Sequence, residues 1–417
     1  MKTGSIFKIH AITLMASALL TISSAWSQTR DDALLAAATA EQASVLKTLE
    51  QLVNIETGIG NEEGLLASGR YVESELKAQG ASVTRHKALA GEAGDNIVGR
   101  ISGKGQRRIL LMAHMDTVYV KGTLAKAPFR VDGNRAFGPG IADDKSGIAV
   151  ILHTLHLLKA RGFDNFATIT VLFNTDEEHS SPGSSDLIQA LAKESDVVLS
   201  FEPNRAIREM MVLGMSGSAR AMVTIKGQAA HAGADPDSGT NAMVEAADFV
   251  LSTLDLDQPS KSFRFNWTIG SQGKVRNIIP DEASIEANVR YVRKEDLDAA
   301  VAALTARAKK PRLPGAQIEV QLVLTRPAWV VDAGSRALVD KAVAIYKEVG
   351  PEMVIFPMVG GGSDAATAAL SGKPVIEGLG LPGFGYHSTQ AEYVLIDAIP
   401  RRLYLASRLI MDLGESK

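Results

Sequence analysis

The stretch Ile109-Leu110-Leu111-Met112-Ala113-His114-Met115-Asp116 decides the fold, because an apolar run ends there on a histidine and an aspartate. A second apolar run, Ala167–Phe173, leads into Asp176-Glu177-Glu178. A third, Val197–Phe201, is followed directly by Glu202. Short apolar runs of this kind are typical of buried β-strands. Ligands of open α/β sheets bind at the carboxyl ends of the strands, so we expect these acids and the histidine to meet in one crevice.

The chain around these runs supplies helices for both faces of such a sheet. Apolar residues at helical spacing predict two helices between Ala33 and Gln79, the second ended by Gly80. Four more helices are predicted over Ser146–Ala160, Ser184–Ala192, Ser335–Val349 and Ala398–Leu413, and two more strands over Asn96–Ile101 and Pro374–Leu379. The alternation of strands and helices predicts an α/β fold whose sheet is covered on both faces.

A second pattern occupies residues 216–325. Its strands and helices are predicted in the order βαββαβ over Ala219–Lys226, Asn241–Leu256, Phe263–Gly270, Ala283–Val292, Glu295–Lys309 and Gln317–Leu324. This order is typical of a small ferredoxin-like unit. We therefore expect an inserted domain at 216–325, flanked by the two parts of a larger domain at 28–215 and 326–417.

Composition excludes several classes of protein. The 417 residues contain no cysteine, which excludes disulfides, thiolate catalysis, zinc fingers and iron–sulfur clusters. The net charge is −3 and no basic run is longer than Arg107-Arg108, so a nucleic-acid partner is not expected.

The first 27 residues are predicted to be a signal peptide. Lys2 and Lys8 precede the apolar run Ala11–Ile22, which is too short to span a bilayer, and Ala25-Trp26-Ser27 has the small-x-small cleavage pattern. No later apolar run reaches membrane-spanning length. We expect a mature protein without a membrane anchor, located in the periplasm or secreted.

The acids and histidines at the strand ends indicate a metal site. Buried carboxylates repel one another and need a cation or protons between them. If the first strand continues, Asp116 faces the same way as His114 and steadies its imidazole. Each feature also has an ordinary explanation. His114 to Asp116 could be a plain strand end, and Asp143-Asp144, in a glycine-rich turn, could cap the helix that follows.

The chain resembles, at these residues, the metallopeptidase family that includes acetylornithine deacetylase, succinyl-diaminopimelate desuccinylase and aminoacylase. Within that family it is similar to the secreted glutamate carboxypeptidases that cleave folates. The resemblance covers nearly the whole chain after the leader and is strongest at His114–Tyr119, Gly138–Lys145, Leu172–Glu178, Asn277–Pro280 and Leu379–His387. It implies a zinc-exopeptidase-like catalytic domain, with a mixed sheet between helices, and an inserted lid that also forms a homodimer.

The resemblance also implies a centre of two Zn²⁺ ions per subunit, with Co²⁺ or Mn²⁺ as alternatives. The implied ligands are Asp143 between the two ions, His114 and Glu202 on one ion, and Glu178 and His387 on the other. Glu177 would be the general base that activates a metal-bridging water and passes its proton to the leaving nitrogen.

The implied substrate contacts lie mostly in the inserted domain. His231 would reach the partner subunit's active site and stabilise the oxyanion, while Asn277, Arg290 and Arg326 would line the substrate pocket. Arginine binds carboxylates in a bidentate manner, as a C-terminal amino acid requires. Gly361 would lie in a backbone loop near the substrate carboxylate. The ordinary alternatives are a solvated strand residue for Arg290 and a plain tight turn around Gly361.

The chain departs from the folate-cleaving enzymes at Met210, where they carry a lysine. Loss of that cation weakens the case for a dicarboxylate unless Arg208 or Lys226 compensates, and a methionine suits an uncharged side chain.

Two substrate classes therefore stay open. One is the amide bond to a C-terminal amino acid, glutamate first, including folate-type N-acyl glutamates. The other is that of an N-acyl-amino-acid amidohydrolase or dipeptidase with a preference for neutral residues. A metal- or solute-binding protein without catalysis is disfavoured, because it has no use for a base such as Glu177.

Overall fold

The computed structural model describes residues 29–415, so the predicted signal peptide lies outside the described residues. Within this range no helix is long and apolar enough to cross a membrane. The α/β class predicted from the sequence is confirmed: a mixed sheet with helices on both faces is joined to a second, antiparallel sheet with helices of its own.

The large sheet has six strands in the order β1-β2-β6-β3-β7-β19. They span Ser82–Lys87 (β1), Asp95–Ser102 (β2), Thr168–Asn174 (β6), Arg108–His114 (β3), Val197–Ser200 (β7) and Val375–Ile376 (β19). β6, β3, β7 and β19 run parallel, whereas β1 and β2 are antiparallel to their neighbours. The carboxyl ends of β6, β3 and β7 therefore lie side by side at one edge.

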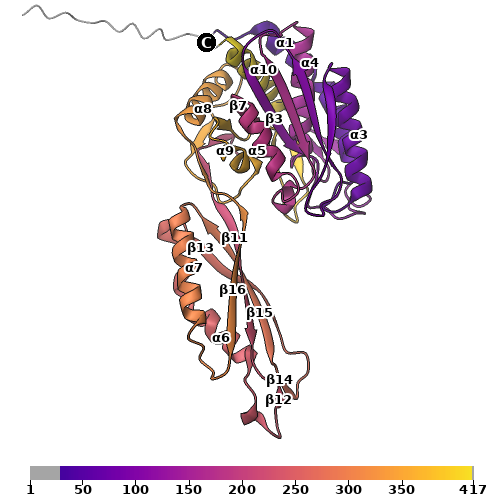
Figure 1. Ribbon diagram of the computed structural model, residues 1–417. Helices are drawn as coiled ribbons and strands as arrows, with labels where there is room; N and C mark the ends of the chain where they lie inside the picture. The colour runs from indigo at the N-terminus through magenta and orange to yellow at the C-terminus, as the bar shows by residue number, and fades with distance from the viewer. Residues whose placement is uncertain (1–28, 416–417) are drawn as a thin grey trace, which may run out of the picture.

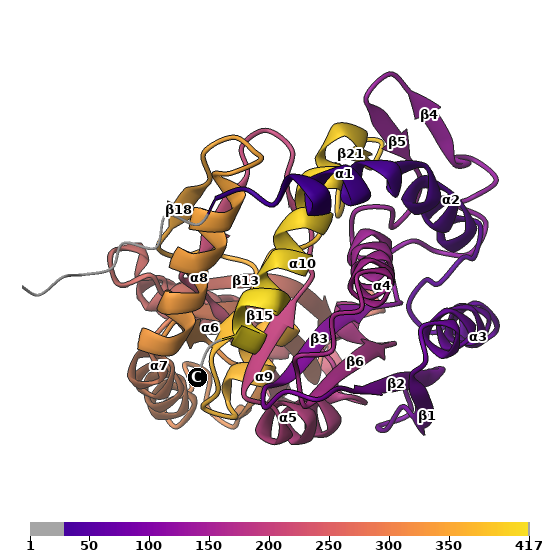
Figure 2. The same ribbon diagram turned by 90° about the horizontal axis from the view of Figure 1, so that it is seen from above.

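Helices cover both faces of this sheet (Figure 2). One face packs on α3 (Glu62–Ala78), α4 (Lys145–Ala160), α8 (Ala333–Tyr346) and α10 (Ile399–Glu415), and the other on α5 (Ser185–Glu194) and α9 (Asp364–Ala369). Alternate residues of β3 face the two cores, Leu111 on the first and Leu110 on the second. Burial of both faces explains why the central strands read as continuous apolar runs.

The N-terminal region corrects one expectation. Two helices were predicted between Ala33 and Gln79, but the structure has three, α1 (Asp32–Ala40), α2 (Gln42–Val53) and α3. A break at Glu41 separates the first two, and Asn61 caps the third by accepting a hydrogen bond from the Gly64 N–H. Alanine-rich sequence on both sides of Glu41 gives no local stop signal.

The described residues also form several smaller sheets. A five-stranded sheet contains β4 (Arg130–Asp132), β5 (Arg135–Phe137), β21 (Tyr393–Leu395), β20 (Pro382–Phe384) and β8 (Asn204–Arg205). Two further pairs are β9 (Met210–Val212) with β18 (Val354–Phe356), and β10 (Gly214–Met215) with β17 (Trp329–Val330).

The second sheet extends away from the first (Figure 1). Its elements are β11 (Gly217–Lys226), α6 (Ala242–Ser252), β13 (Arg264–Gln272), β15 (Glu282–Tyr291), α7 (Lys294–Ala308) and β16 (Gln317–Arg326), and the antiparallel strand order is β13-β15-β11-β16. This is the predicted βαββαβ order. The domain boundaries at 216 and 325 remain our proposal, and we refer to residues 217–326 as the lid.

The lid has its own apolar core. Phe249 of α6 and Leu304 of α7 pack on inward-facing residues of the sheet, including Val223 and Ile285. A short pair of strands, β12 (Ala230–His231) and β14 (Ile278–Ile279), lies at the end of the lid farthest from the large sheet (Figure 1).

We predict that Leu304→Ala destabilises the lid by about 2–5 kcal/mol, because it opens a cavity at a fully buried position. The matched control is Leu251→Ala on α6, where the side chain is 68% exposed and the change should stay within about 0.5 kcal/mol. Hydrogen exchange, followed separately for each peptide of the chain, measures this loss of stability. Faster exchange confined to lid peptides is expected, whereas equal acceleration in β3 would show that the two cores unfold as one.

Candidate metal centre

The five predicted ligand residues come from five places along the chain and meet at the carboxyl edge of the large sheet. His114 is the last residue of β3, and Glu178 lies in a short 3₁₀ helix, η1 (Glu177–His179), just after β6. Glu202 follows β7 by two residues. Asp143 precedes α4, and His387 follows β20. Adjacent parallel strands bring the first three together, as expected for a sheet of this type.

These side chains form two groups that share Asp143. Its Oδ1 lies 3.1 Å from His114 Nε2, which is 3.7 Å from Glu202 Oε1. Its Oδ2 lies 3.2 Å from His387 Nε2, which is 3.0 Å from Glu178 Oε2. In each group the three candidate ligand atoms lie within 4.8 Å of one another. One carboxylate with an oxygen in each group suits a bridging ligand for two metal ions.

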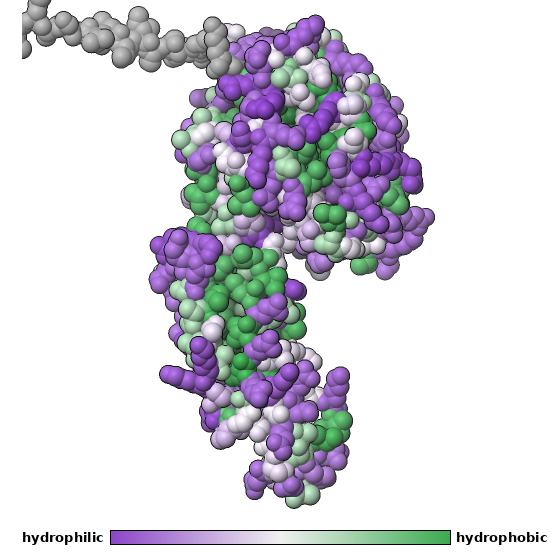
Figure 3. All heavy atoms as spheres, viewed as in Figure 1, coloured by the Kyte–Doolittle hydropathy of each residue, from purple (hydrophilic) through white to green (hydrophobic). Residues whose placement is uncertain are grey.

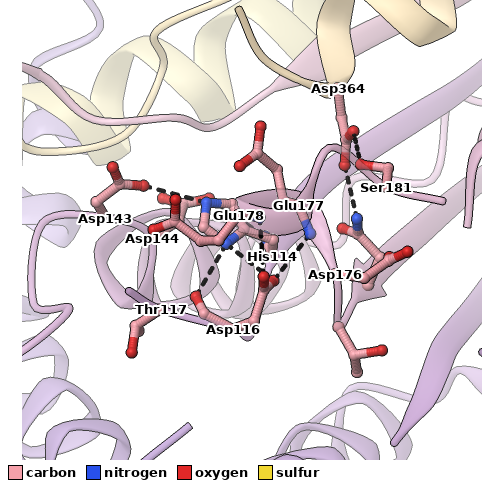
Figure 4. A network of polar contacts seen from close by, with 12 residues as sticks. His114, Asp116, Thr117, Asp143, Asp144, Asp176, Glu177, Glu178, Ser181 and Asp364 are labelled. Carbon is pink, nitrogen blue, oxygen red and sulfur yellow. Dashed lines mark hydrogen bonds and ion pairs between the residues drawn. The ribbon is translucent and has the colours of Figure 1, made fainter. Parts of the chain in front are cut away.

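Asp116 contacts both His114 and the backbone of the acidic pair Glu177-Glu178. His114 Nδ1 lies 3.1 Å from the Asp116 carbonyl oxygen and 3.3 Å from its Oδ1, which leaves Nε2 to face the other ligands (Figure 4). The same carboxylate accepts hydrogen bonds from the backbone N–H groups of Glu177, at 3.1 Å, and Glu178, at 2.8 Å. The buried Asp116 therefore orients one ligand side chain and fixes the backbone of the acidic pair.

Glu392 positions Asp143, and the sequence analysis did not identify it. Its buried carboxylate accepts hydrogen bonds from the backbone N–H groups of Gly140 (2.9 Å), Ala142 (2.7 Å) and Asp143 (3.0 Å). The neighbouring Asp144 caps α4 through the N–H of Gly147. Glu392 stands alone between an alanine and a tyrosine, so no local pattern marks it.

Arg326 contacts the acidic pair directly. This last residue of β16 is 5% exposed, and its Nη2 lies 2.8 Å from both Oε1 and the carbonyl oxygen of Glu177. Its Nη1 donates to Asp364 Oδ1 at 3.0 Å, and Asp364 also accepts hydrogen bonds from Asn174 and Ser181. The sequence pointed to Arg326 as a substrate contact, and the structure places it on the predicted base.

Burial controls the protonation of the centre. It raises the pKa of Glu177 to about 8, even though Arg326 and His114 act in the opposite direction. It also raises the pKa of Glu178 and Glu202. Hydrogen bonds to Asp143 and Glu178 raise the pKa of His387 to about 10. In the metal-free protein, protons therefore occupy positions that a cation would neutralise, which is the behaviour expected of an assembled metal site.

A cavity of about 380 Å³ opens beside the two groups. It is lined in part by Asp143, Glu202 and His387, and Gly361 also lies in its wall. The volume falls within the usual range for small-molecule sites, about 300–1,000 Å³.

The remaining predicted contacts lie at opposite ends of the lid. Arg290 and Arg326 flank Ser218 from the two neighbouring strands at the root of the lid. Burial lowers the pKa of Arg290, and the nearby positive charge of Arg326 lowers it further. His231 and Asn277 lie in and next to β12 and β14, at the far end of the lid, and do not reach the chain's own centre (Figure 1).

The sequence model of peptidase family M20/M25/M40 matches residues 110–412 of the chain. The chain belongs to this family. Carboxypeptidase G2 of Pseudomonas sp. (strain RS-16) is 58% identical over 407 residues, which cover 98% of each protein. The chain is therefore a metallopeptidase, and the resemblance drawn from its motifs is confirmed.

Solved structures of the family share the fold. An aminopeptidase, PepT, from Bacillus cereus ATCC 10987 aligns over 89% of this chain and 98% of its own, with a TM-score of 0.74 and 22% identity. The M20 family metallo-carboxypeptidase Sso-CP2 from Sulfolobus solfataricus aligns over 89% and 99%, with a TM-score of 0.74 and 15% identity. At these identities the likeness concerns the fold.

We predict that Glu392→Gln weakens metal binding about 10- to 100-fold, because an amide presents one acceptor and a donor to three backbone N–H groups. Metal affinity measured by competition with a chelator tests this. Glu352→Gln, at an exposed position, is the control and should bind metal as the unmodified protein does. Equal affinities in the two variants would remove Glu392 from the support of Asp143.

We also predict that metal binding releases protons at pH 7 and tightens as the pH rises from about 6 to 8. The raised pKa values of His114 and His387 keep both imidazoles protonated in the metal-free protein, and a metal must displace those protons. Calorimetry in two buffers with different ionisation enthalpies measures the protons released. An affinity that does not change with pH would contradict this account.

Proposed function

We propose that the protein is an exported dizinc metallo-carboxypeptidase that hydrolyses the amide bond to a C-terminal amino acid. The observation that carries the proposal is Asp143, which offers one oxygen to each of two ligand groups, with the buried Glu177 next to the ligand residue Glu178 in η1. A solute-binding protein needs no buried carboxylate there beyond the ligands.

The donor set fits zinc. Two imidazoles and three carboxylates converge, and each histidine presents its Nε2 to the shared aspartate. When bound by these residues, Zn²⁺ would supply Lewis acidity for the amide carbonyl and for the attacking water. Co²⁺ and Mn²⁺ accept the same ligands.

Glu177 is proposed as the general base. Burial favours its protonated form, so its carboxylate is a stronger proton acceptor than an exposed glutamate and is suited to taking a proton from water near pH 7. The carboxylic acid then gives the proton to the leaving nitrogen, which departs as the free amine of the amino acid. Arg326 holds the Glu177 side chain through Oε1 and leaves Oε2 for this exchange.

Arg290 is proposed to bind the free carboxylate of the substrate. Its side chain is half-buried at the root of the lid and donates Nε to Asn288 Oδ1 at 3.2 Å, while its Nη groups have no protein partner among the described residues. Arg326 is already paired with Glu177 and Asp364, so Arg290 is the guanidinium that can bind a carboxylate in a bidentate manner and orient it. The resemblance makes glutamate the first substrate to test, including N-acyl glutamates of the folate type.

A second candidate is an N-acyl-amino-acid amidohydrolase or dipeptidase activity with a preference for neutral residues. The observation in its favour is that neither Arg208 nor Lys226 replaces the missing cation at Met210. Arg208 is exposed and does not line the cavity, and Lys226 lies at the distal end of β11.

We propose that the protein is a homodimer and that His231 acts in the partner's active site. His231 and Asn277 lie too far along the lid to serve their own centre (Figure 1). The lid also shows an apolar area (Figure 3), and its exposed apolar side chains include Leu251, Ile269 and Leu324. β13, which carries Ile269, is an edge strand open to pairing.

We predict that Glu177→Gln keeps both metal ions but loses about 10²–10⁴-fold or more in kcat, since the carboxamide cannot accept the proton. Metal content by elemental analysis and kcat on an N-acyl amino acid are the two measurements. The matched control is Glu92→Gln, a nearby carboxylate that faces His179. Residual activity above a tenth of the unmodified protein's would reject Glu177 as the base.

We predict that co-expressed Glu177→Gln and His231→Ala subunits recover about a quarter of full activity, although each variant alone is inactive. Half of the dimers formed are mixed, and one of the two sites in a mixed dimer has both native residues. Differently tagged subunits allow the mixed dimer to be isolated. If the mixture stays inactive, each centre uses its own lid or the protein is a monomer.

A further inference from the structure

The cavity beside the metal centre has an apolar wall formed by four residues. Met210 and Val212 come from β9, Met215 comes from β10, and Val359 lies opposite Met215 in an isolated bridge. Met210, Val212 and Met215 are each less than 10% exposed. Their side chains lie on the same cavity as Asp143, Glu202 and His387, so a substrate at the metal centre meets this wall.

The backbone holds this wall in place. The Asn204 carboxamide accepts a hydrogen bond from the Met210 N–H at 2.9 Å and donates one to its carbonyl oxygen at 2.7 Å. β9 also pairs in parallel with β18, and the Val359 N–H donates to the Gly214 carbonyl oxygen at 3.0 Å. The apolar surface is therefore a fixed feature of the cavity rather than the result of a mobile side chain.

The charged groups of the cavity do not favour a second substrate carboxylate at this wall. Besides the metal-site residues, the lining contains one carboxyl group, Glu377, and one guanidinium group, Arg205. Glu377 is buried and its Oε2 has no hydrogen-bond partner within the described residues. Arg205 is exposed, so water and salt screen its charge.

The free main-chain carboxylate of the substrate is proposed to bind Arg290, which is not part of this apolar wall. Gly362, which lines the cavity, lies against the Arg326 side chain, because a Cβ added at Gly362 would stand 2.7 Å from Arg326 Cδ. Arg326 therefore packs on the 360–363 loop, and Arg290 stands across Ser218 from it; neither arginine lines the cavity itself. A C-terminal residue whose carboxylate faces this pair has its side chain free to enter the apolar part.

We propose, on the basis of the proposed carboxypeptidase function, that this wall is the side-chain pocket of the C-terminal residue and selects large uncharged apolar side chains over glutamate. Leucine, methionine and phenylalanine gain contact with Met210, Val212, Met215 and Val359. A glutamate side chain would lose hydration at the same surface without a buried cation to replace it.

The test uses the zinc-loaded full chain and three substrates that share one acyl group, N-benzoyl-leucine, N-benzoyl-glutamine and N-benzoyl-glutamate. Glutamine and glutamate have nearly the same shape and differ in charge. We expect kcat/KM for the leucine substrate to exceed that for glutamate at least about tenfold, with glutamine between them. A kcat/KM for glutamate equal to or above that for leucine would overturn the inference and leave the carboxypeptidase function standing.

Binding measurements test the inference separately from the proposed function. The Glu177→Gln variant turns over too slowly to consume substrate, so calorimetry gives its Kd for each compound. If the unmodified protein cleaves none of the three, the proposed function is wrong and these Kd values decide the inference alone. Tighter binding of the leucine compound supports the pocket assignment, and equal or tighter binding of the glutamate compound overturns it.

Met210→Lys tests the wall itself, with Met210→Leu as the matched control. The lysine should shift the leucine-to-glutamate ratio of kcat/KM toward glutamate by about tenfold or more, whereas the leucine should leave the ratio close to the original. Val359→Lys is a second variant at a less buried position and keeps the test usable if Met210→Lys does not fold. An unchanged ratio in a folded lysine variant would exclude that residue from the pocket.

Discussion

Buried carboxylates repel one another at the carboxyl edge of the large sheet. The groups around them must hold these carboxylates together in spite of that repulsion. Glu177, Glu178 and Glu202 lie close to Asp143, and burial penalises the charged forms of these three glutamates by raising their pKa. A cluster of this kind is stable only with bound cations or protons. The supporting groups provide the rest: Asp116 anchors the acidic pair through its backbone, and Glu392 anchors the turn that carries Asp143.

The lid is tied to this centre at its root. β16 ends on Arg326, whose guanidinium group binds both Glu177 and Asp364, so the last residue of the lid strand β16 belongs to the network around the proposed base. Arg290 stands one strand away across Ser218. The same domain carries His231 at its opposite end. The lid thus carries one arginine pair beside its own metal centre and one histidine far from it, which is the arrangement that the proposed dimer would use.

Much of the fold could be predicted because the signals are local. The apolar runs that precede His114, Glu177 and Glu202 became β3, β6 and β7, and the βαββαβ order of the lid followed from periodicity. Expectations failed where the signal is not local. The break at Glu41 has no stop residue, and Glu392 acts through three backbone N–H groups about 250 residues away in the chain. Motif resemblance supplied the ligand assignments, but it did not indicate that Arg326 contacts Glu177.

The sequence by itself determined which acids and histidines follow the buried strands, because apolar runs, turn residues and acids are properties of neighbouring positions. Only the tertiary structure decided how those residues share contacts. It gave Asp143 two histidine neighbours, placed Arg326 on Glu177 and assembled Met210, Val212, Met215 and Val359 into one wall. These contacts join segments far apart in the chain, and their distances depend on how strands and helices pack, which no local pattern of residues encodes.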